Sequence, residues 1–563
     1  MDVQRVILIS ALALITYLIV LQWNNDYNQP PQIPTEQATI SAYSGAPQSE
    51  IPQIDTTQTT GDVPSAVSEA VVPTTPAAAQ TEQTQFINIK TDLLDLTIDA
   101  RGGDIIRTAL LEHKAQIDSD QPFVLLEQTN SRVYVAQSGL VGRDGPDANP
   151  EGRPLFTSTQ TSYQMGDQDQ LSVDLIHVDD KGIEYTKRFT FTRGSYNIEM
   201  DYQVNNQSDT PFQGILFGQL KRDNTSDPTS SSALAMSSYL GAVFSTADNK
   251  YQKVTFKDMD KGAFREISTD GWVAMLQHYF LSAWIPSAGA DYTYLTRKIN
   301  NQYIAGFLSP SFEVMPGQTT AVSANLFIGP KDQDQLIATA ENLKLTVDYG
   351  WLWWIAYPLY WLLTFIQGIV GNWGLAIIGI TVVVKLALFH LNAKAFRSMA
   401  KMRKFGPEMM RMKELYGDDR QKMSQEMMTL YKREKINPLG GCLPIVAQMP
   451  VFIALYWVLM ESVELRHAPF FGYIQDLSVM DPYFILPILM GITMFLQQKL
   501  NPTPPDPMQA KIMKMLPIIF TFFFLWFPAG LVLYWLVNNI LSITQQYVIT
   551  KQIEKEETKP AKA

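Results

Sequence analysis

Long apolar runs stand at the start of the chain and again throughout its last third. They cover 6–23, 351–370, 373–391, 443–460, 483–498 and 516–550, and Pro528-Ala529-Gly530 divides the last of them. At ~1.5 Å per residue, a helix over the first run crosses most of a ~30 Å hydrocarbon layer. A cleaved signal peptide is the alternative, but no small-residue cleavage site follows Trp23, so we expect an uncleaved anchor. The pattern predicts a multi-span α-helical membrane protein.

The region between the first run and the later ones has a different pattern. Residues 27–84 are rich in Pro, Gln, Thr, Ser and Ala and contain no basic residue, which is typical of a disordered tether. From Phe86 onward, short runs of β-branched and aromatic residues alternate with turn signals, as in Phe189-Thr-Phe191. These runs predict a large antiparallel β-sandwich to about Gly329, followed by a helix over 331–345.

The charge of the loops orients the spans, because cytoplasmic loops are enriched in Lys and Arg. Residues 392–438 carry twelve basic residues against six acids, and 499–514 carry three against one, which predicts that both face the cytoplasm. Residues 461–482 hold one Arg against four acids, which predicts the opposite side. No basic residue occurs between Arg5 and Lys90, so this stretch is expected to be exported.

The run 351–370 is ambiguous. It is apolar enough to span, but only Gly371-Asn372 separates it from the next run, and a span here would conflict with the orientation of the basic loop. Seven aromatic residues fall within its first fifteen positions, and such rings settle at the level of the lipid headgroups. We expect a helix lying along the outer membrane surface, with a re-entrant hairpin as the alternative.

These patterns predict six transmembrane helices, both termini in the cytoplasm and one large exported domain, as in a Gram-negative inner-membrane protein. The expected segments are an N-terminal transmembrane anchor (1–23), a disordered periplasmic tether (24–84), a periplasmic sandwich with a C-terminal linker helix (85–346), an amphipathic surface helix (347–371), the second span (372–392), a cytoplasmic helical hairpin (393–438), the third span (439–461), a periplasmic loop (462–482), the fourth span (483–499), a cytoplasmic loop (500–514), the fifth and sixth spans (515–550) and a cytoplasmic tail (551–563).

Composition and charge restrict the classes of function. The 563 residues carry a net charge of −11, but residues 24–347 hold 22 basic against 39 acidic residues while the rest holds 22 against 16. The acidic exported part excludes DNA as a general partner, because nucleic acids bind basic surfaces. A single cysteine, Cys442, and five histidines without ligand spacing predict no metal and no other cofactor. The scattered carboxylates of the exported part form no catalytic pair, so we do not expect an enzyme.

Lys385 is the one ionisable residue inside the apolar run 373–391. It lies roughly 18 Å along a helix from Trp373, and a charge at mid-membrane costs at least ~2.5–3.5 kcal/mol. Thr381 lies one turn earlier on the same face, and Gln448 places a polar group in the next run. Together they predict a water-containing cavity between helices. Two alternatives stay open: Lys385 snorkels to the cytoplasmic surface, and the polar groups form only interhelical hydrogen bonds.

Two of the apolar runs are short. A helix over 483–498 reaches about 24 Å and one over 516–527 about 18 Å, against ~30 Å of hydrocarbon. The bilayer beside them is therefore expected to be thinned. A wet cavity next to thinned lipid lowers the barrier for a polar peptide segment to cross, so this region points to insertion chemistry.

The basic segment after the second run is expected to form a helical hairpin. One helix over 393–416, with a break at Gly406-Pro407, meets a turn at Gly417-Asp418-Asp419, and a second helix runs to about Lys435. Methionines alternate with basic side chains along it, and the expected client-binding residues are Met399, Met402, Arg403, Met409, Met410, Met427 and Met428. Methionine surfaces adapt to varied apolar partners, which suits capture of nascent hydrophobic segments. The alternative is that the methionines pack on one another while the cations touch lipid headgroups.

Specific motifs recur through the chain. In the helical part they include Ser398-Met-Ala-Lys-Met-Arg403, Asn437-Pro-Leu-Gly-Gly-Cys442, Gln448-Met-Pro450 and Phe524-Leu-Trp-Phe-Pro528. In the exported part they include Gly271-Trp-Val-Ala-Met-Leu-Gln277 and Val347-Asp-Tyr-Gly-Trp-Leu-Trp353. Apart from the tether and the last dozen residues, the chain resembles the bacterial YidC insertases of the YidC/Oxa family, in their Gram-negative form.

The resemblance implies an insertase and foldase for nascent inner-membrane proteins. It implies a core of five helices around a hydrophilic groove, a periplasmic β-supersandwich and a surface helix. In the family a positive groove residue, usually arginine, attracts the acidic exported tail of the client, and it aligns with Lys385. Thr381 matches a groove-lining threonine, and Tyr534-Trp535 matches an aromatic pair that faces the substrate. The expected substrate groove thus comprises Lys385, Thr381, Gln448, Tyr534 and Trp535.

The resemblance also implies partners. The family acts alone or beside the SecYEG translocon with its SecDF accessory, in a phospholipid bilayer. The tail 551–563 carries four Lys against three Glu, so any ribosome contact is expected to be weak and to use the cytoplasmic loops.

Two other functions remain as alternatives. A solute transporter would also explain an intramembrane lysine, although no repeated pair of broken helices is visible. An envelope biogenesis factor that acts through the exported domain would explain the size of that domain.

Overall fold

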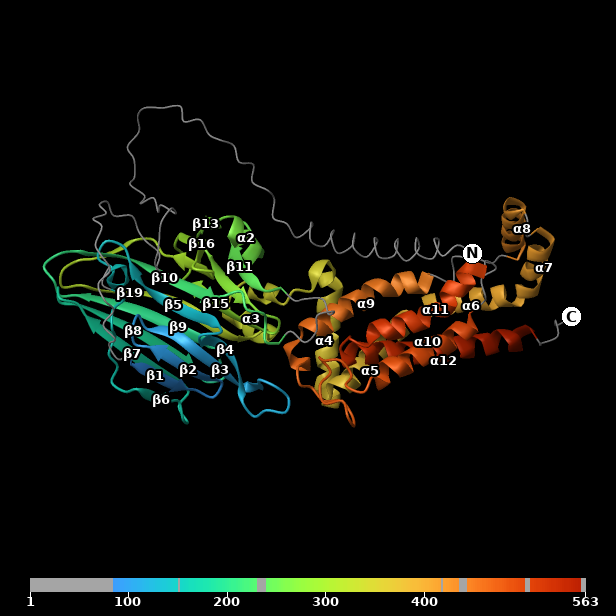
Figure 1. Ribbon diagram of the computed structural model, residues 1–563, viewed down its shortest axis with the longest axis horizontal. Coiled ribbons are helices and arrows are strands. Elements are labelled where there is room, and N and C mark those ends of the chain that lie inside the picture. The colour runs from blue at the N-terminus through green and yellow to red at the C-terminus, as the bar shows by residue number, and fades with distance from the viewer. Residues whose placement is uncertain are drawn as a thin grey trace, which may run out of the picture.

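The computed structural model describes residues 85–149, 152–229, 239–416, 419–434, 443–501 and 507–557. The expected anchor, the tether, the turn at Gly417-Asp418, the motif over 437–442 and the end of the tail lie outside the described residues. The described chain forms a β-rich part followed by a helical part, and the two lie end to end (Figure 1).

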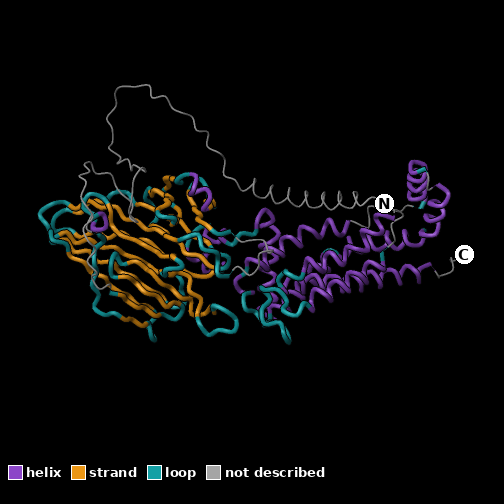
Figure 2. Tube along the Cα trace, in the orientation of Figure 1, coloured by secondary structure: helices purple, strands orange, loops and turns teal. Residues whose placement is uncertain are grey.

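Two large sheets form the β-rich part (Figure 2). The first holds β1 (Phe86–Lys90), β2 (Leu94–Asp99), β3 (Asp104–Lys114), β4 (Pro122–Gln128), β5 (Val133–Val141), β6 (Ser162–Gln164), β10 (Phe212–Arg222), β13 (Arg265–Ser268), β16 (Tyr292–Ile299), β17 (Gln302–Leu308) and β18 (Phe312–Val314), in the order β13-β16-β17-β10-β5-β4-β3-β2-β1-β6 with β18 beside β10. The second holds β7 (Gln170–Val178), β8 (Ile183–Thr192), β9 (Asn197–Asn206), β11 (Gly241–Thr246), β12 (Gln252–Thr255), β14 (Gly271–Leu276), β15 (Phe280–Pro286) and β19 (Thr319–Pro330), in the order β12-β11-β14-β15-β19-β9-β8-β7. The large β-sandwich expected from the sequence is confirmed; its edge strand β6 pairs with β1 in parallel, whereas neighbours such as β1 and β2 or β8 and β9 are antiparallel.

Alternation of side chains along the strands produces the core of the sandwich. In β9, Ile198 and Tyr202 are fully buried, while the residues between the inward positions are half-buried or exposed. Successive side chains of a strand point to opposite faces, so one face of each sheet meets the other sheet. Polar contacts also cross the interior: the indole N–H of Trp284 on β15 donates to the carbonyl oxygen of Gln219 on β10 at 3.2 Å.

A buried cation links the two sheets. Lys187 on β8 is 0% exposed, and its ammonium donates to the carbonyl oxygens of Gly102, Gly103 and Ser138 at 3.0, 3.1 and 2.9 Å. Ser138 belongs to β5 and the two glycines form the turn before β3, so all three acceptors come from the first sheet. Burial lowers the pKa of Lys187 to about 8, because the charged form loses its hydration.

The helical part follows the sandwich. It consists of α3 (Gln333–Thr339), α4 (Trp353–Val370), α5 (Trp373–Ala387), α6 (Phe389–Lys404), α7 (Gly406–Tyr416), α8 (Arg420–Arg433), α9 (Leu443–Glu461), α10 (Ile485–Leu500), α11 (Pro507–Phe524) and α12 (Ala529–Glu557). Short 3-10 turns cover η2 (Leu343–Thr346), η3 (Gly350–Leu352) and η5 (Val463–Leu465), and the sandwich contains η1 (Pro146–Ala148) and α2 (Phe256–Lys261). The expected helix over 331–345 is thus present only as α3 and η2.

The expected second span does not continue straight to residue 392. The helix α5 ends at Ala387, and α6 begins at Phe389 after a bend of 68°. The amide of Leu388 still donates to the carbonyl oxygen of Val384 at 3.0 Å, which closes the last turn of α5. From His390 onward α6 carries several polar and basic residues, and its axis departs from that of the apolar α5.

The expected cytoplasmic loop over 500–514 is also shorter than predicted. Pro507 is the first residue of α11, so residues 507–514 are helical and the helix has 18 residues. Proline suits the first helical position because its fixed φ and missing N–H cost nothing there. Basic residues interrupt the apolar pattern in this first part of the helix, so the apolar run begins only after it. The run 516–527 therefore understated the length of the helix, which weakens the case for thinned lipid beside it.

The helix α4 lies across the end of the helical bundle that faces the sandwich (Figure 1). The long helices α9, α10 and α12 run along the bundle, whereas α4 runs across them, and it continues through Pro358. Large apolar side chains are exposed along it, among them Trp353, Trp354, Trp361 and Phe365. By length and hydropathy, Gly350–Val370 is the one described helix that suffices to cross a membrane by itself, and the bent pair of α5 and α6 is a second candidate.

A packed junction connects the sandwich to the near end of α9. Lys331, directly after β19, forms an ion pair with Glu461 at 3.3 Å, and the two side chains are only 2% and 5% exposed. His278, between β14 and β15, is hydrogen-bonded through Nε2 to the carbonyl oxygen of Met460 at 2.8 Å. Because a buried charge needs its partner, this pair fixes the register between the two parts of the chain.

Candidate functional site

Polar side chains of the helical part meet between α5, α9 and α12. Lys385 on α5 is 8% exposed, and its ammonium donates a hydrogen bond to the hydroxyl of Ser542 on α12 at 2.7 Å. Ser542 in turn donates to the carbonyl oxygen of Asn538 at 2.7 Å. The ammonium is therefore directed across the bundle, which favours the buried position over snorkelling toward the end of the helix.

Gln448 joins the same cluster from α9. Its side chain is half-buried, and Nε2 donates to the side-chain oxygen of Asn538 at 2.5 Å. On the adjacent face of α12, Asn539 donates to the hydroxyl of Thr493 on α10 at 3.4 Å. The cluster thus contains interhelical hydrogen bonds as well as a buried cation. Such bonds lower the cost of placing polar groups between apolar helices.

Thr381 lies one turn before Lys385 but does not take part in this network. Its hydroxyl donates to the carbonyl oxygen of Ile377, on its own helix, at 2.6 Å, and the residue is 1% exposed. Threonine hydroxyls in apolar helices commonly bond back to the preceding turn in this way. The expected groove-lining hydroxyl therefore has its hydrogen in use within α5.

The aromatic pair of α12 divides between two environments. Tyr534 is 1% exposed and stacks against Phe452 of α9 at 6.2 Å between ring centres. Trp535 is half-buried, and its ring meets Phe452 edge-on at 4.6 Å and lies 5.2 Å from Phe524 of α11. Of the two rings, Trp535 is the one with surface available to another molecule.

Ser542, the partner of the buried lysine, is not among the site residues expected from the sequence. A signal was present, because Tyr534, Asn538 and Ser542 recur at every fourth position and so share one face of α12. The long apolar run around them obscured this face. The contact itself joins positions 157 residues apart, and no local pattern predicts it.

The helices α7 and α8 pack together at the end of the bundle opposite the sandwich (Figure 1) and carry Met409, Met410, Met427 and Met428, whereas Met399, Met402 and Arg403 belong to α6. Met409 is 4% exposed, and the hydroxyl of Tyr431 donates to its sulfur at 3.5 Å. Met410 and Met428 are 57% and 51% exposed. The remaining expected residues are Met399, Met402 and Met427, which are half-buried, and Arg403, which is exposed. Met409 is therefore packed inside the hairpin, whereas Met410 and Met428 lie at its surface; binding of clients by the exposed methionines stays a prediction.

No group of three or more His, Cys, Asp or Glu side chains within the described ranges is arranged to hold a metal ion. The chemistry of the helical cluster is instead that of a fixed cation among neutral donors and acceptors. Such a cluster can attract and orient an anionic group.

Two family descriptions match adjoining parts of the chain: residues 86–362 match the YidC periplasmic domain, and residues 365–557 match the 60Kd inner membrane protein family. A relative from Marinomonas sp., named membrane protein insertase YidC, is 54% identical over 557 residues, which is 99% of this chain and 100% of the relative. A relative of the same name from Pseudomonas aeruginosa is 52% identical over 578 residues, covering 98% and 99% of the two chains. A solved structure described as an active YidC insertase is 16% identical and covers 83% of this chain and 93% of that one, with a TM-score of 0.38, a likeness too weak to place individual residues.

Both halves of the chain therefore match the two parts of one family, and the curated relatives are more than half identical over nearly their whole length. The chain belongs to the YidC family of membrane protein insertases.

Proposed function

We propose that this protein inserts nascent proteins into the bacterial inner membrane and assists their folding there. The observation that carries the proposal is the buried Lys385, held by Ser542 between α5 and α12. Placing a cation in an apolar bundle costs considerable free energy. A charged residue in this position is therefore taken as the mark of a functional site. The names of the relatives support the same activity.

The proposed topology has six transmembrane helices: the anchor over 6–23, and α5, α9, α10, α11 and α12. The sandwich and the hairpin lie at opposite ends of the bundle (Figure 1), which supports a periplasmic sandwich and a cytoplasmic hairpin. Hydropathy alone would let α4 span, but this helix runs across the others, so we place it on the periplasmic membrane surface. Its exposed tryptophans suit the headgroup level there.

In this mechanism Lys385 provides the attraction for the polar exported tail of a client. An ammonium has three N–H groups. One of them bonds Ser542, and no other hydrogen bond from this ammonium reaches the described residues. At ~4 Å, opposite charges attract about four times more strongly at an effective dielectric constant near 20 than in water. A tail carboxylate near Lys385 is therefore attracted more strongly than it would be in water, and this attraction offsets part of the hydration that the carboxylate loses.

The hydrophobic helix of the client would leave along the apolar faces of α10 and α11. Ile488 and Ile492 on α10 are 50% and 51% exposed, and Ile518 and Phe522 on α11 are 62% and 64% exposed. Contiguous exposed apolar surface of this kind contacts lipid or another apolar helix. The client thus separates into a polar tail drawn to the buried cation and a helix that remains in contact with hydrocarbon.

The identity of the cation shapes this mechanism. Lysine presents a compact point charge on a flexible stem, whereas arginine presents a rigid fork of five donors. With lysine, the direction of the charge depends on its hydrogen-bond partner. In this chain Ser542 provides that direction.

We propose that the hairpin receives the client on the cytoplasmic side. Met410 and Met428 supply exposed thioether surface, while buried Met409 holds α7 against α8. The proposed partners are nascent inner-membrane proteins and, in some reactions, the SecYEG translocon with SecDF. A ribosome would contact the hairpin and the segment that leads into α11 only weakly.

Site-specific photo-crosslinking to a stalled nascent membrane protein tests the proposal. The probe is placed at Gln448 and Trp535, which are half-buried in the bundle, and at Ile488 on the apolar face; Val178, 56% exposed on the sandwich, serves as the control. We expect the polar tail of the client to react with the two bundle positions, the hydrophobic segment with position 488, and neither with position 178. Absence of adducts from both bundle positions would overturn the proposal.

A further inference from the structure

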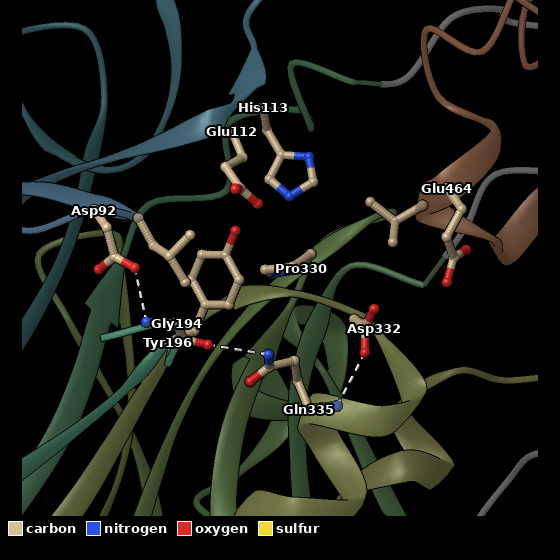
Figure 3. A pocket seen from close by; sticks show the side chains of 11 residues that line it. Asp92, Glu112, His113, Gly194, Tyr196, Pro330, Asp332, Gln335 and Glu464 are labelled. Carbon is tan, nitrogen blue, oxygen red and sulfur yellow. Dashed lines mark hydrogen bonds between the residues drawn. The ribbon is translucent and has the colours of Figure 1, made fainter. Parts of the chain in front are cut away.

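A cavity of about 370 Å³ lies where the sandwich meets the membrane part of the chain (Figure 3). The side chains that matter for its chemistry are Asp92, Glu112, His113, Tyr196, Asp332 and Glu464. The first five come from the sandwich and the start of its linker helix, and Glu464 comes from the 3-10 turn after α9. An occupant of this cavity would therefore touch both parts of the protein.

The lining of the cavity is strongly acidic. Four carboxyl groups, Asp92, Glu112, Asp332 and Glu464, surround it, and no Lys or Arg is among the described residues that line it. Burial and the nearby Arg466 lower the pKa of His113 to about 4, so this histidine is neutral at neutral pH. A positively charged occupant would neutralise this lining, and an anion would be repelled.

Two cations close to the lining in the chain or in space, Lys331 and Arg466, are engaged elsewhere. Lys331, which precedes Asp332, is paired with Glu461. Arg466 donates to the carbonyl oxygen of Ala115 at 3.0 Å and stands 5.4 Å from the centre of the Phe123 ring. Burial raises the pKa of Glu464, as expected for a carboxyl group that lacks a neighbouring cation.

Tyr196 provides an observation independent of these charges. The residue as a whole is 4% exposed, and its hydroxyl makes no hydrogen bond to a described residue. Figure 3 shows this hydroxyl directed toward Glu112 and His113 at the centre of the cavity. Two carboxylate oxygens of the lining, Oδ1 of Asp92 and Oε2 of Glu464, are also buried without a partner in the described structure. Buried polar groups are normally bonded, so these two carboxylate oxygens lack a donor.

We propose that this cavity binds a primary ammonium group, carried by a small amine or by the ethanolamine headgroup of a lipid. An ammonium offers three N–H donors and a positive charge, which matches a phenolic oxygen and several carboxylates around one space. Among the described residues no three carboxyl or imidazole groups lie close enough together to hold a metal ion, so the lining is spaced for an occupant larger than a bare ion. Glu464 also accepts a hydrogen bond from Tyr360 of α4 at 2.7 Å. With α4 on the membrane surface, the cavity lies at the headgroup level.

The occupant has a structural consequence. It bridges acidic groups of the sandwich and Glu464 of the membrane part, next to the Lys331–Glu461 pair. A ligand that binds only the native arrangement stabilises it by mass action. The ammonium therefore stabilises the junction, in addition to the buried ion pair.

Titration of the full chain in phosphatidylcholine nanodiscs tests this inference, with putrescine and ethanolamine as probes. We expect one saturable site, weakened about tenfold by Glu112→Gln and by Tyr196→Phe. Asp180→Asn, which removes an equal charge from the exposed turn between β7 and β8, should leave binding unchanged. Because no client is present, failure of this test would leave the insertion mechanism untouched.

The two sources of the ammonium are separated by lipid exchange. If the lipid headgroup is the natural occupant, it competes with putrescine, so the apparent affinity for putrescine is lower in phosphatidylethanolamine nanodiscs. If a soluble amine is the natural occupant, the affinity for putrescine is the same in both kinds of nanodisc. Three results would overturn the proposal: no saturable binding of either probe, equal weakening by Asp180→Asn, or a site that takes magnesium but neither amine.

Discussion

The ammonium of Lys385 on α5 is hydrogen-bonded to the hydroxyl of Ser542 on α12, 2.7 Å away and 157 positions later in the chain. Ser542 is itself anchored on the carbonyl oxygen of Asn538. The direction in which this lysine presents its charge is therefore set by the last long helix and not by its own. For a flexible side chain carrying a point charge, such a partner decides where an anionic group can bind.

Loss of this partner should weaken insertion. Ser542→Ala leaves the buried ammonium without its acceptor, a change that costs about 1–3 kcal/mol for a buried polar group. We expect insertion of a client with an acidic tail into proteoliposomes to fall several-fold. Thr544→Ala, which removes an exposed hydroxyl bonded only to its own helix, should have little effect.

The contact predicts a specific coupling. In a Lys385→Met background, Ser542→Ala should cause no further loss, because the interaction that it breaks is already absent. Independent, multiplicative losses in the double variant would show that Ser542 acts by some route other than orienting the lysine.

The junction should respond to removal of one buried charge. Glu461→Gln leaves Lys331 buried without its counter-ion, and breaking such a pair typically costs about 3–5 kcal/mol. We expect a clear drop in the melting temperature of the full chain in detergent and faster proteolysis between β19 and α4. Replacing both partners, as Lys331→Met with Glu461→Leu, should restore most of the stability; a double variant as unstable as the single one would contradict this account.

The sandwich should carry a pH dependence that originates from Lys187. Its folded-state pKa is about 8 against an ordinary value of 10.5, so between these values the unfolded chain binds more protons. Stability from this group therefore rises as pH increases from about 8 to 10.5, because the unfavourable buried charge is being lost. Melting curves of the full chain and of Lys187→Met isolate this effect. The difference in melting temperature between the two chains should change as the pH passes from about 8 to 10.5. A constant difference across this range would contradict the prediction.

The hairpin methionines should separate into two classes. Exchanging exposed Met410 and Met428 for serine should reduce crosslinking to nascent hydrophobic segments while leaving thermal stability nearly unchanged. Met409→Ser should instead destabilise the packing of α7 on α8, by roughly 2–5 kcal/mol as for other large-to-small changes in cores. Equal effects of both changes on crosslinking, with stability unaffected, would contradict the division.

Much of the architecture follows from local pattern. The β-sandwich appears where β-branched and aromatic residues alternate with turn signals, and α9 and α10 lie close to their apolar runs. The break between α5 and α6 was not predictable, because neither Gly nor Pro marks Leu388. The start of α11 was missed for a different reason, since the basic residues of its first turns resemble a loop.

Within the site, Lys385 could be predicted from the sequence, but the residues that surround it could not. A lone lysine in an apolar run can be recognised from the sequence alone. Its hydrogen bond to Ser542 depends on how two helices that are distant in the sequence pack together. The same holds for Lys331 and Glu461, which look like ordinary surface charges until the sandwich and α9 meet. Long-range contacts between polar residues leave no periodic signal of the kind that defines helices and strands.

The central claim is that the buried charge of Lys385 draws acidic exported tails across the membrane. It is tested most directly by reconstituting the full chain and its Lys385→Ala and Lys385→Arg variants with two clients that differ only in whether the tail contains aspartates or asparagines. The fraction of client whose tail is protected from added protease then measures insertion for each combination of variant and client. The account predicts that Lys385→Ala impairs the acidic client much more than the neutral one, while Lys385→Arg retains the preference. Equal loss for both clients, or no loss for either, would contradict it.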